Sequence, residues 1–333
     1  MTTHSIFAHA PRLAAVTAGI AMTLGSLSAS AAQFNAKLSL DVPEGNTKYV
    51  AAQQFADLVR ERTDNNVDIQ LFPNSVLGGE TESAEGIRLG SVQMGIITSS
   101  VLSSWIPEVQ VLDLPYVITD EANASALSEP LTKALSPSFE DQGFHLLGFT
   151  VNGVRELMSS FPIHSINDIQ GKKMRVIQSP LHVDAWRAAG ANPTPVPAPE
   201  IYNSMQTGVI DFFDNTATNY LTNRFYEVAP YYVKTDHIYA MGTWVVAQNW
   251  WNRLPDDYQQ AITEAALEVQ SQVPEMRQKD DEAALAQTVE DGATIVEIED
   301  KTPWMEAMAP VRDKYIDQIP NGAELVELIR NAK

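Results

Sequence analysis

The chain has 333 residues, which is enough for about two domains of ordinary size. Hydrophobic residues make up 44% of it and charged residues 19%, as in globular proteins and unlike disordered ones. It has 22 Lys and Arg against 42 Asp and Glu, a formal net charge of −20, so nucleic acids and anionic membranes are disfavoured as partners. The chain has no cysteine, which excludes disulfides, thiolate metal ligands, cysteine nucleophiles and lipid attachment through cysteine.

The first 32 residues have the composition of a secretory signal peptide. Arg12 precedes a mostly apolar run from Leu13 to Leu27, and small residues of the kind that signal peptidase accepts follow as far as Ala32. The run is shorter than the ~20 residues that a membrane-spanning helix needs. We therefore expect cleavage after Ala31 or Ala32, release of a soluble exported protein, and localisation in the periplasm of a Gram-negative bacterium.

Strands and helices are predicted to alternate along the rest of the chain. In its first part, the hydrophobic pattern predicts helices over 51–58 and 80–89 and strands over 37–42, 67–71 and 92–97. Further along, it predicts helices over 181–189 and 200–207 and strands over 143–150, 173–177, 209–213 and 238–246. This alternation is typical of βαβ units and predicts an α/β fold.

A long helix is predicted to begin at Pro255. Its apolar positions are Ile262, Ala266, Val269, Val273 and Met276, and Pro274 is expected to kink it because proline has no backbone N–H. After the signal peptide (1–32), the whole pattern predicts two α/β lobes. Lobe I is expected to comprise 33–152 and 241–280, and lobe II is expected to comprise 153–240 and 281–333.

The sequence motifs of common enzymes are absent. The chain has no G-x-S-x-G, H-E-x-x-H, Walker A or G-x-G-x-x-G pattern, and its 6 His residues have no ligand-like spacing. His237 lies beside a predicted strand, where a hydrogen-bonded structural role is favoured over catalysis. The sequence therefore predicts no catalytic residue and no metal ligand.

Short motifs spread over the mature chain indicate a family. They are Leu77-Gly78-Gly79-Glu80, Asp113-Leu114-Pro115-Tyr116-Val117, Asn152-Gly153-Val154-Arg155, Gly171-Lys172-Lys173-Met174-Arg175-Val176, Gly190-Ala191-Asn192-Pro193-Thr194-Pro195, Gln206-Thr207-Gly208-Val209-Ile210-Asp211, Asn215 and Phe225-Tyr226-Glu227-Val228. In this order and spacing they resemble the DctP-type solute-binding proteins of tripartite ATP-independent periplasmic (TRAP) transporters. The resemblance covers essentially the whole mature chain.

The resemblance implies a two-lobed periplasmic solute-binding-protein fold, with a hinge and a long kinked helix that spans both lobes. It implies that a small organic acid is captured between the lobes without a cofactor and delivered to a membrane permease of a small and a large subunit. A sugar acid or a C4-dicarboxylate is the expected ligand, and a monomer is the expected state. A sensory protein that presents the ligand to a receptor is one alternative. An exported hydrolase or lyase, which would turn the ligand over, is another.

Two arginines and an asparagine are the leading ligand-binding candidates. Arg175 lies in the apolar strand predicted over 173–177, where an unpaired charge is costly. The resemblance implies that its planar guanidinium holds the ligand carboxylate, and the alternative is an ion pair with an acid of the chain. Arg155, at the predicted crossover between the lobes, is implied to lie near the same carboxylate, with a hinge salt bridge as its alternative. Asn215 is implied to hydrogen-bond the acid group.

Further candidates come from the ends of the first strands and from later strands. Open α/β sheets bind ligands at the ends of their strands, which favours contacts from Asp41, Glu80 and Thr98. Helix caps or surface positions are the alternative for these side chains. Pocket walls are expected from Phe213, Tyr239 and Trp244, for which core packing is the alternative.

Several positions depart from the pattern of the resembling family. Phe212 replaces a glycine, and Asp214 is one carbon shorter than the usual glutamate. Ala198 and Pro199 stand where relatives often have an aromatic residue and a serine. These differences predict an altered pocket, so the ligand of no single relative is carried over.

The signal peptide gives a first testable prediction. Mass spectrometry of the exported protein is expected to find an N-terminus at Ala32 or Gln33, because cleavage is expected after Ala31 or Ala32. An exported chain that begins near Met1 would contradict it.

Overall fold

The computed structural model describes residues 32–332, so the predicted signal peptide and its cleavage site lie almost entirely outside the described residues. Residues 32–332 are a mixed α/β protein built on one nine-stranded sheet. Eight strands follow the order β2-β1-β3-β8-β4-β7-β5-β6, and the ninth, β9, pairs with β8 outside this order. The strands are β1 (Phe34–Ser39), β2 (Val67–Phe72), β3 (Met94–Thr98), β4 (Phe144–Ser159), β5 (Lys173–Val176), β6 (Asn192–Pro195), β7 (Phe212–Asn215), β8 (Tyr231–Ala247) and β9 (Thr294–Glu297).

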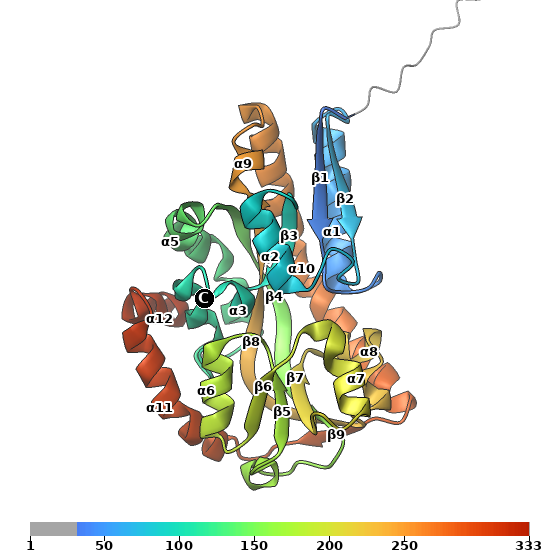
Figure 1. Cartoon of the computed structure of the whole chain (residues 1–333), viewed down its shortest axis with the longest axis vertical. Helices are drawn as coiled ribbons and strands as arrows, with labels where there is room; N and C mark the ends of the chain where they lie inside the picture. Colours follow the sequence, from blue (N-terminus) through green and yellow to red (C-terminus); the bar gives the residue numbers. More distant parts are fainter. Residues whose placement is uncertain (1–31, 333) are drawn as a thin grey trace, which may run out of the picture. The chain divides into compact units, whose positions relative to one another are not determined.

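Helices surround this sheet (Figure 1). They are α1 (Thr47–Arg62), α2 (Glu80–Leu89), α3 (Ser99–Leu102), α4 (Glu121–Ser125), α5 (Ser128–Asp141), α6 (Pro180–Ala188), α7 (Ile201–Gln206), α8 (Ala217–Thr222), α9 (Gln248–Trp251), α10 (Asp256–Glu290), α11 (Thr302–Gln318) and α12 (Gly322–Asn331). The short 3₁₀ turns are η1 (Pro107–Asp113), η2 (Ile166–Ile169), η3 (Ala198–Glu200) and η4 (Phe225–Glu227). Within residues 32–332, no helix combines the length and the apolar content of a membrane span.

Strands β4 and β8 join the two halves of the sheet. They have 16 and 17 residues, pair antiparallel from end to end apart from three interruptions, and lie between β1–β3 on one side and β5–β7 on the other (Figure 1). Their register shifts between Leu146 and Gly148, between Val151 and Gly153, and between Arg155 and Leu157. Such shifts bend a strand and redirect its side chains, so the middle of β4 is shaped to aim residues into a site.

The last of these shifts is fixed by the carboxyl group of Glu156. Residues 234–237 of β8 leave the ladder opposite Glu156. The Glu156 Oε2 atom accepts hydrogen bonds from the backbone amides of Thr235 at 2.5 Å and Asp236 at 2.8 Å. These bonds satisfy donors that the broken ladder leaves unpaired, and the bulge places His237 inward, where it is buried.

The buried hydrophobic residues form separate cores in the two halves, which gives the molecule two lobes. One large cluster is made mainly by β1–β3, α1, α2, α5 and the first half of α10. Two smaller clusters are made by β5, α6 and α11, and by α7, α8 and η4. The lobe boundaries predicted from the sequence remain our proposal, although several residues assigned to lobe II belong to the large cluster, namely Ile177, Leu181, Tyr315, Ile319 and residues of α12. Leu325, Val326 and Ile329 of α12 belong to the large cluster, because only that core completes the burial of the helix's apolar face.

Most predicted elements are found with shifted ends. The strand predicted over 209–213 begins only at Phe212, because the backbone amides of Val209 and Ile210 both donate to Ser204 O and close the end of α7. Helix α10 continues through Pro274 to Glu290, and its kink stays a prediction. The last predicted apolar position of α10, Met276, is only partly buried. The next residue, Arg277, is buried in its place.

A glycine in the bent part of β4 gives a prediction about stability. Gly153 has φ of +130°, and an added Cβ would lie 2.9 Å from Cγ2 and 3.0 Å from Cβ of Thr216. Gly153→Ala is therefore expected to lower the free energy of unfolding by about 3 kcal/mol, from backbone strain and overpacking together. Gly292→Ala is the control, since its φ is +101° with no atom within 4 Å, and about 1–2 kcal/mol is expected from strain alone. Equal losses in urea unfolding would contradict the packing constraint.

Candidate ligand-binding site

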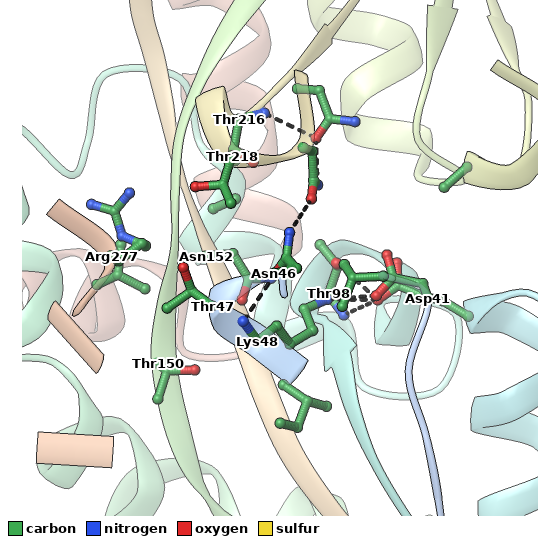
Figure 2. Close-up of a pocket in the computed structure, with 18 of the residues that line it drawn as sticks. Asp41, Asn46, Thr47, Lys48, Thr98, Thr150, Asn152, Thr216, Thr218 and Arg277 are labelled. Carbon is green, nitrogen blue, oxygen red and sulfur yellow. Dashed lines mark hydrogen bonds and ion pairs between the residues drawn. The ribbon is translucent and has the colours of Figure 1, made fainter. Parts of the chain in front are cut away.

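A cavity lies between the two lobes and is lined from both. All of the sequence-predicted site residues except Phe213 and Tyr239 line it. Figure 2 shows Asn46, Thr47 and Lys48 reaching it from the start of α1, and Thr216 and Thr218 from the start of α8. Helix α10 adds Arg277. The first and last lining residues, Asp41 and Arg277, are 236 positions apart in the sequence. The cavity therefore brings together side chains that are far apart along the chain.

Arg175 is a buried cation without an acidic partner. It lies on β5 and is 3% exposed, and its Nε donates to Val196 O at 2.7 Å. Burial, helped by the nearby charge of Arg155, lowers the pKa of Arg175 to about 10. Among residues 32–332 it forms no ion pair with a carboxylate. The structural alternative for this arginine is therefore not found, and a buried cation that lines a cavity favours an anionic ligand.

Arg155 has the ion pair that Arg175 lacks. Its Nε donates to Asp214 Oδ2 at 2.6 Å, and its Nη2 donates to Asp214 Oδ1 and to Asp214 O, both at 2.8 Å. Burial alone would raise the pKa of Asp214, but the Arg155 guanidinium outweighs it and holds that pKa well below its usual range. Arg155 thus combines both sequence-based interpretations. It is a salt bridge at the crossover, and it also lines the cavity, with its charge already compensated.

His237 supports this pair from behind. Its Nε2 lies 3.1 Å from Asp214 Oδ2, and its Nδ1 lies 2.8 Å from Thr235 Oγ1. Because a carboxylate only accepts, Nε2 carries the proton and Nδ1 accepts from the threonine hydroxyl. Burial lowers the pKa of His237 and keeps the ring neutral. His237 therefore has a hydrogen-bonded structural role, and it orients Asp214.

Asn215 ends β7 and faces the cavity. Its Oδ1 accepts from the Thr216 amide at 2.9 Å and from Asn219 Nδ2 at 2.9 Å, which leaves its own Nδ2 for a ligand acceptor. Asn219 Oδ1 in turn accepts from Asn46 Nδ2 at 2.9 Å. Asn46 caps α1 by accepting from the Lys48 amide at 3.0 Å. This chain of amides (Asn46, Asn219 and Asn215) links the two lobes at the cavity.

A second charged group has more acid than base. Lys48 Nζ lies 2.7 Å from Asp41 Oδ1 and 3.6 Å from Glu80 Oε1. Glu80 Oε1 also accepts from the amide and the hydroxyl of Thr98, at 2.7 and 2.9 Å. Burial, together with the neighbouring Asp41, raises the pKa of Glu80. Two carboxylates thus share one ammonium, and their remaining lone pairs suit ligand hydroxyls, which can donate to them.

The aromatic candidates divide between wall and core. Trp244 lines the cavity, and its Nε1 donates to Thr150 Oγ1 at 3.0 Å. Phe213 is fully buried in the core, and its ring centroid lies 5.0 Å from that of Phe225. Tyr239 is half-buried against the large hydrophobic cluster. For Phe213 and Tyr239 the structure therefore favours core packing. The pleat of β8 turns Tyr239 to the face opposite Ala240, which lines the cavity. Phe213 shares the face of Asn215, but it is packed against Phe225 in the core.

Sequence reasoning missed Lys48, Asn46, Asn219 and Arg277. Arg277 forms ion pairs with Glu121 and Asp281. A signal for it was present, since a charged residue on the apolar stripe of a helix needs a partner. Asn46 and Lys48 follow the first strand as a helix cap and first turn, a position at which open α/β sheets bind ligands. Nothing local distinguishes Asn219.

A cavity between two α/β lobes, lined from both sides and holding a buried cation without an acidic partner, defines a solute-binding protein. The sequence matches the family described as bacterial extracellular solute-binding protein, family 7, over residues 38–318. The chain belongs to this family, that of the periplasmic solute-binding proteins of TRAP transporters. The two-lobed α/β fold and the family that the motifs predicted are thereby confirmed.

Known relatives differ in what they bind. The 2,3-diketo-L-gulonate-binding periplasmic protein of Escherichia coli K12 is 28% identical over 312 residues, which cover 93% of this chain and 94% of the relative. The TRAP solute-binding protein of Sulfitobacter sp. NAS-14.1, solved with β-D-galacturonate, matches with a TM-score of 0.84 at 27% identity, covering 90% of this chain and 100% of that one. The protein of Sulfurospirillum deleyianum, solved with succinate, matches with a TM-score of 0.84 at 27% identity, covering 91% and 100%.

The contrast between the two arginines gives a prediction about stability. Arg155→Met leaves the buried Asp214 carboxylate without its cation, so the free energy of unfolding is expected to fall by about 3–5 kcal/mol. Arg175→Met removes a buried charge that has no acidic partner, so stability is expected to stay equal or rise. Urea unfolding of both variants without ligand measures this. A loss for Arg175→Met as large as that for Arg155→Met would show that Arg175 is paired after all.

Proposed function

We propose that this protein captures a sugar acid with a single carboxylate, of the hexuronate class, in the periplasm and delivers it to the membrane subunits of a TRAP transporter. The observation that carries the proposal is the distribution of charge in the cavity. One cation, Arg175, has no acidic partner among the described residues, and the group of Asp41, Lys48 and Glu80 has two carboxyl groups to one ammonium.

The other two arginines that line the cavity have acidic partners. Arg155 is offset by Asp214, and Arg277 is offset by Glu121 and Asp281. A ligand carboxylate is therefore directed to Arg175, whose guanidinium can bind it with two hydrogen bonds. The amide Nδ2 of Asn215 and the remaining Nη1 of Arg155 are donors for the same oxygens.

The acid-rich group selects against a second carboxylate. A dicarboxylate placed on Arg175 brings its other acid into the field of Asp41 and Glu80, where like charges repel. Hydroxyls instead donate hydrogen bonds to those carboxylates and accept from Lys48. Relatives that bind galacturonate and 2,3-diketo-L-gulonate support a sugar acid. The succinate-binding relative represents the alternative, which this arrangement of charges disfavours.

The mechanism follows from the two lobes. Arg175, Arg155 and Asn215 belong to one predicted lobe, and Asp41, Lys48 and Glu80 belong to the other. A ligand that contacts both groups stabilises the closed arrangement and shifts the open–closed equilibrium towards it. We place the hinge where β4 and β8 change register, beside Gly153 and Arg155.

Because the task is capture and release, we propose that the ligand is returned chemically unchanged. We also propose that the protein works as a monomer after removal of its signal peptide, and that a small and a large permease subunit receive the ligand.

Calorimetric titration tests the ligand class. Galacturonate and glucuronate are expected to bind at least tenfold more tightly than succinate, because only the sugar acids satisfy Asp41 and Glu80 with donors. Tighter binding of succinate would overturn the argument from charge. NMR spectra of the ligand after prolonged incubation are expected to be unchanged, and a new product would indicate an enzyme.

Variants at Arg175 test the site. Arg175→Ala is expected to weaken binding of the sugar acid by a factor of about a hundred or more, since losing one partner of a buried charge pair costs about 3–5 kcal/mol. Arg175→Lys is expected to bind poorly as well, because an ammonium cannot make the two-pronged contact. Arg187→Ala is the control, with a side chain that is 64% exposed. Wild-type affinity in Arg175→Ala would refute the assignment of the site.

A further inference from the structure

A second cavity adjoins the first and shares part of its wall. Both cavities are lined by Asp41, Val42, Ala198, Asn215 and Asn219. Ala198 has the smallest side chain among these shared residues and fills the least space between the two cavities. We propose that the two cavities form one extended site, which also binds an acidic disaccharide, with the second sugar ring in the second cavity. This inference rests on the proposed function and extends it.

Polar groups in the second cavity are not used by the protein. The hydroxyl of Ser75 is buried without a hydrogen-bond partner among the described residues. Asn223 donates from Nδ2 to Asn219 O at 3.1 Å, which leaves its carbonyl oxygen available. Asn74 lines the same cavity, and its side-chain amide makes no hydrogen bond to residues 32–332. A buried hydroxyl without a partner is costly, and amides that both donate and accept are suited to sugar hydroxyls.

The backbone holds these groups in place. Asn74 and Ser75 have φ of +57° and +55°, in the left-handed region that few residues other than glycine occupy. Their amides donate to Val42 O at 2.9 Å and Leu40 O at 3.0 Å, which fixes the turn to the segment after β1. Strain kept at a turn that lines a cavity is typical of a binding loop.

The charges that line the second cavity indicate whether the second sugar ring is acidic or neutral. Asp41 is its one ionisable lining residue within the described chain, and Lys48 already pairs with it. The wall thus offers no cation to a second carboxylate. The ligand class is therefore an aldobiouronic acid, in which one uronic acid is joined to one neutral sugar. A diuronide, with an acid on each ring, is disfavoured.

Calorimetry with glucuronate, with glucuronate linked to xylose, and with digalacturonate tests the proposal. The mixed disaccharide is expected to bind within tenfold of glucuronate, and digalacturonate at least tenfold more weakly than the mixed disaccharide. Asn223→Trp fills the second cavity and is expected to weaken the disaccharide at least tenfold while changing glucuronate less than twofold. Leu267→Trp, at a position that is 54% exposed on α10, is the matched control. Ser75→Ala is expected to weaken only the disaccharide, by about three- to tenfold.

The outcomes separate this inference from the proposed function. Binding of glucuronate without binding of the disaccharide overturns the extended site and leaves the proposed function standing. An equal loss of both ligands in Asn223→Trp also overturns it, because the substitution would then act on the shared cavity. Binding of neither ligand overturns both proposals.

Discussion

The bidentate ion pair between Arg155 and Asp214 is the interaction on which the site depends. It joins β4 to β7 at the point where β4 changes register against β8, and His237 of β8 holds the same carboxylate. Three strands are thus tied at one buried charge pair. The pair also decides the electrostatics of the cavity, because it neutralises one of two neighbouring arginines and leaves Arg175 as the cation without an acid. Without Asp214, two like charges would face each other in a buried space.

The same region couples recognition to the arrangement of the lobes. Asn215 offers its Nδ2 to the cavity while its Oδ1 accepts from Asn219, and Asn219 accepts from Asn46 at the cap of α1. The proposed ligand contact of Asn215 and the contact between the lobes are therefore assigned to neighbouring atoms of the same side chain. An amide shared in this way is sensitive both to the ligand and to the distance between the lobes.

The sequence predicted those site residues that can be recognised from their immediate neighbours in the chain. Arg175 was predicted because a charge in an apolar strand is anomalous, and Glu80 because it follows the end of a predicted strand in an open α/β sheet. The partner of Arg155 could not be found, since Asp214 is 59 positions away and many other acids compete in so acidic a chain. The alternating pattern places Phe213 on the face of Asn215, but it does not say that the core, rather than the cavity, covers that position. The helical spacing allowed Met276 and Arg277 equally on the buried stripe of α10, and only tertiary packing chose between them. Likewise, the place of α12 depends on which core has an apolar surface left to cover.

The continuity of β4 and β8 has a mechanical consequence. In a protein whose lobes are joined by loose linkers, closure costs mainly entropy. Here both crossing strands are hydrogen-bonded to each other along their length, interrupted only at the register shifts. Any change in the angle between the lobes must therefore bend a shared ladder. The ladder resists bending least at the register shifts, where hydrogen bonds between the strands are missing. In the proposed mechanism, part of the free energy of binding bends this ladder, and the bent ladder favours reopening once the ligand has left.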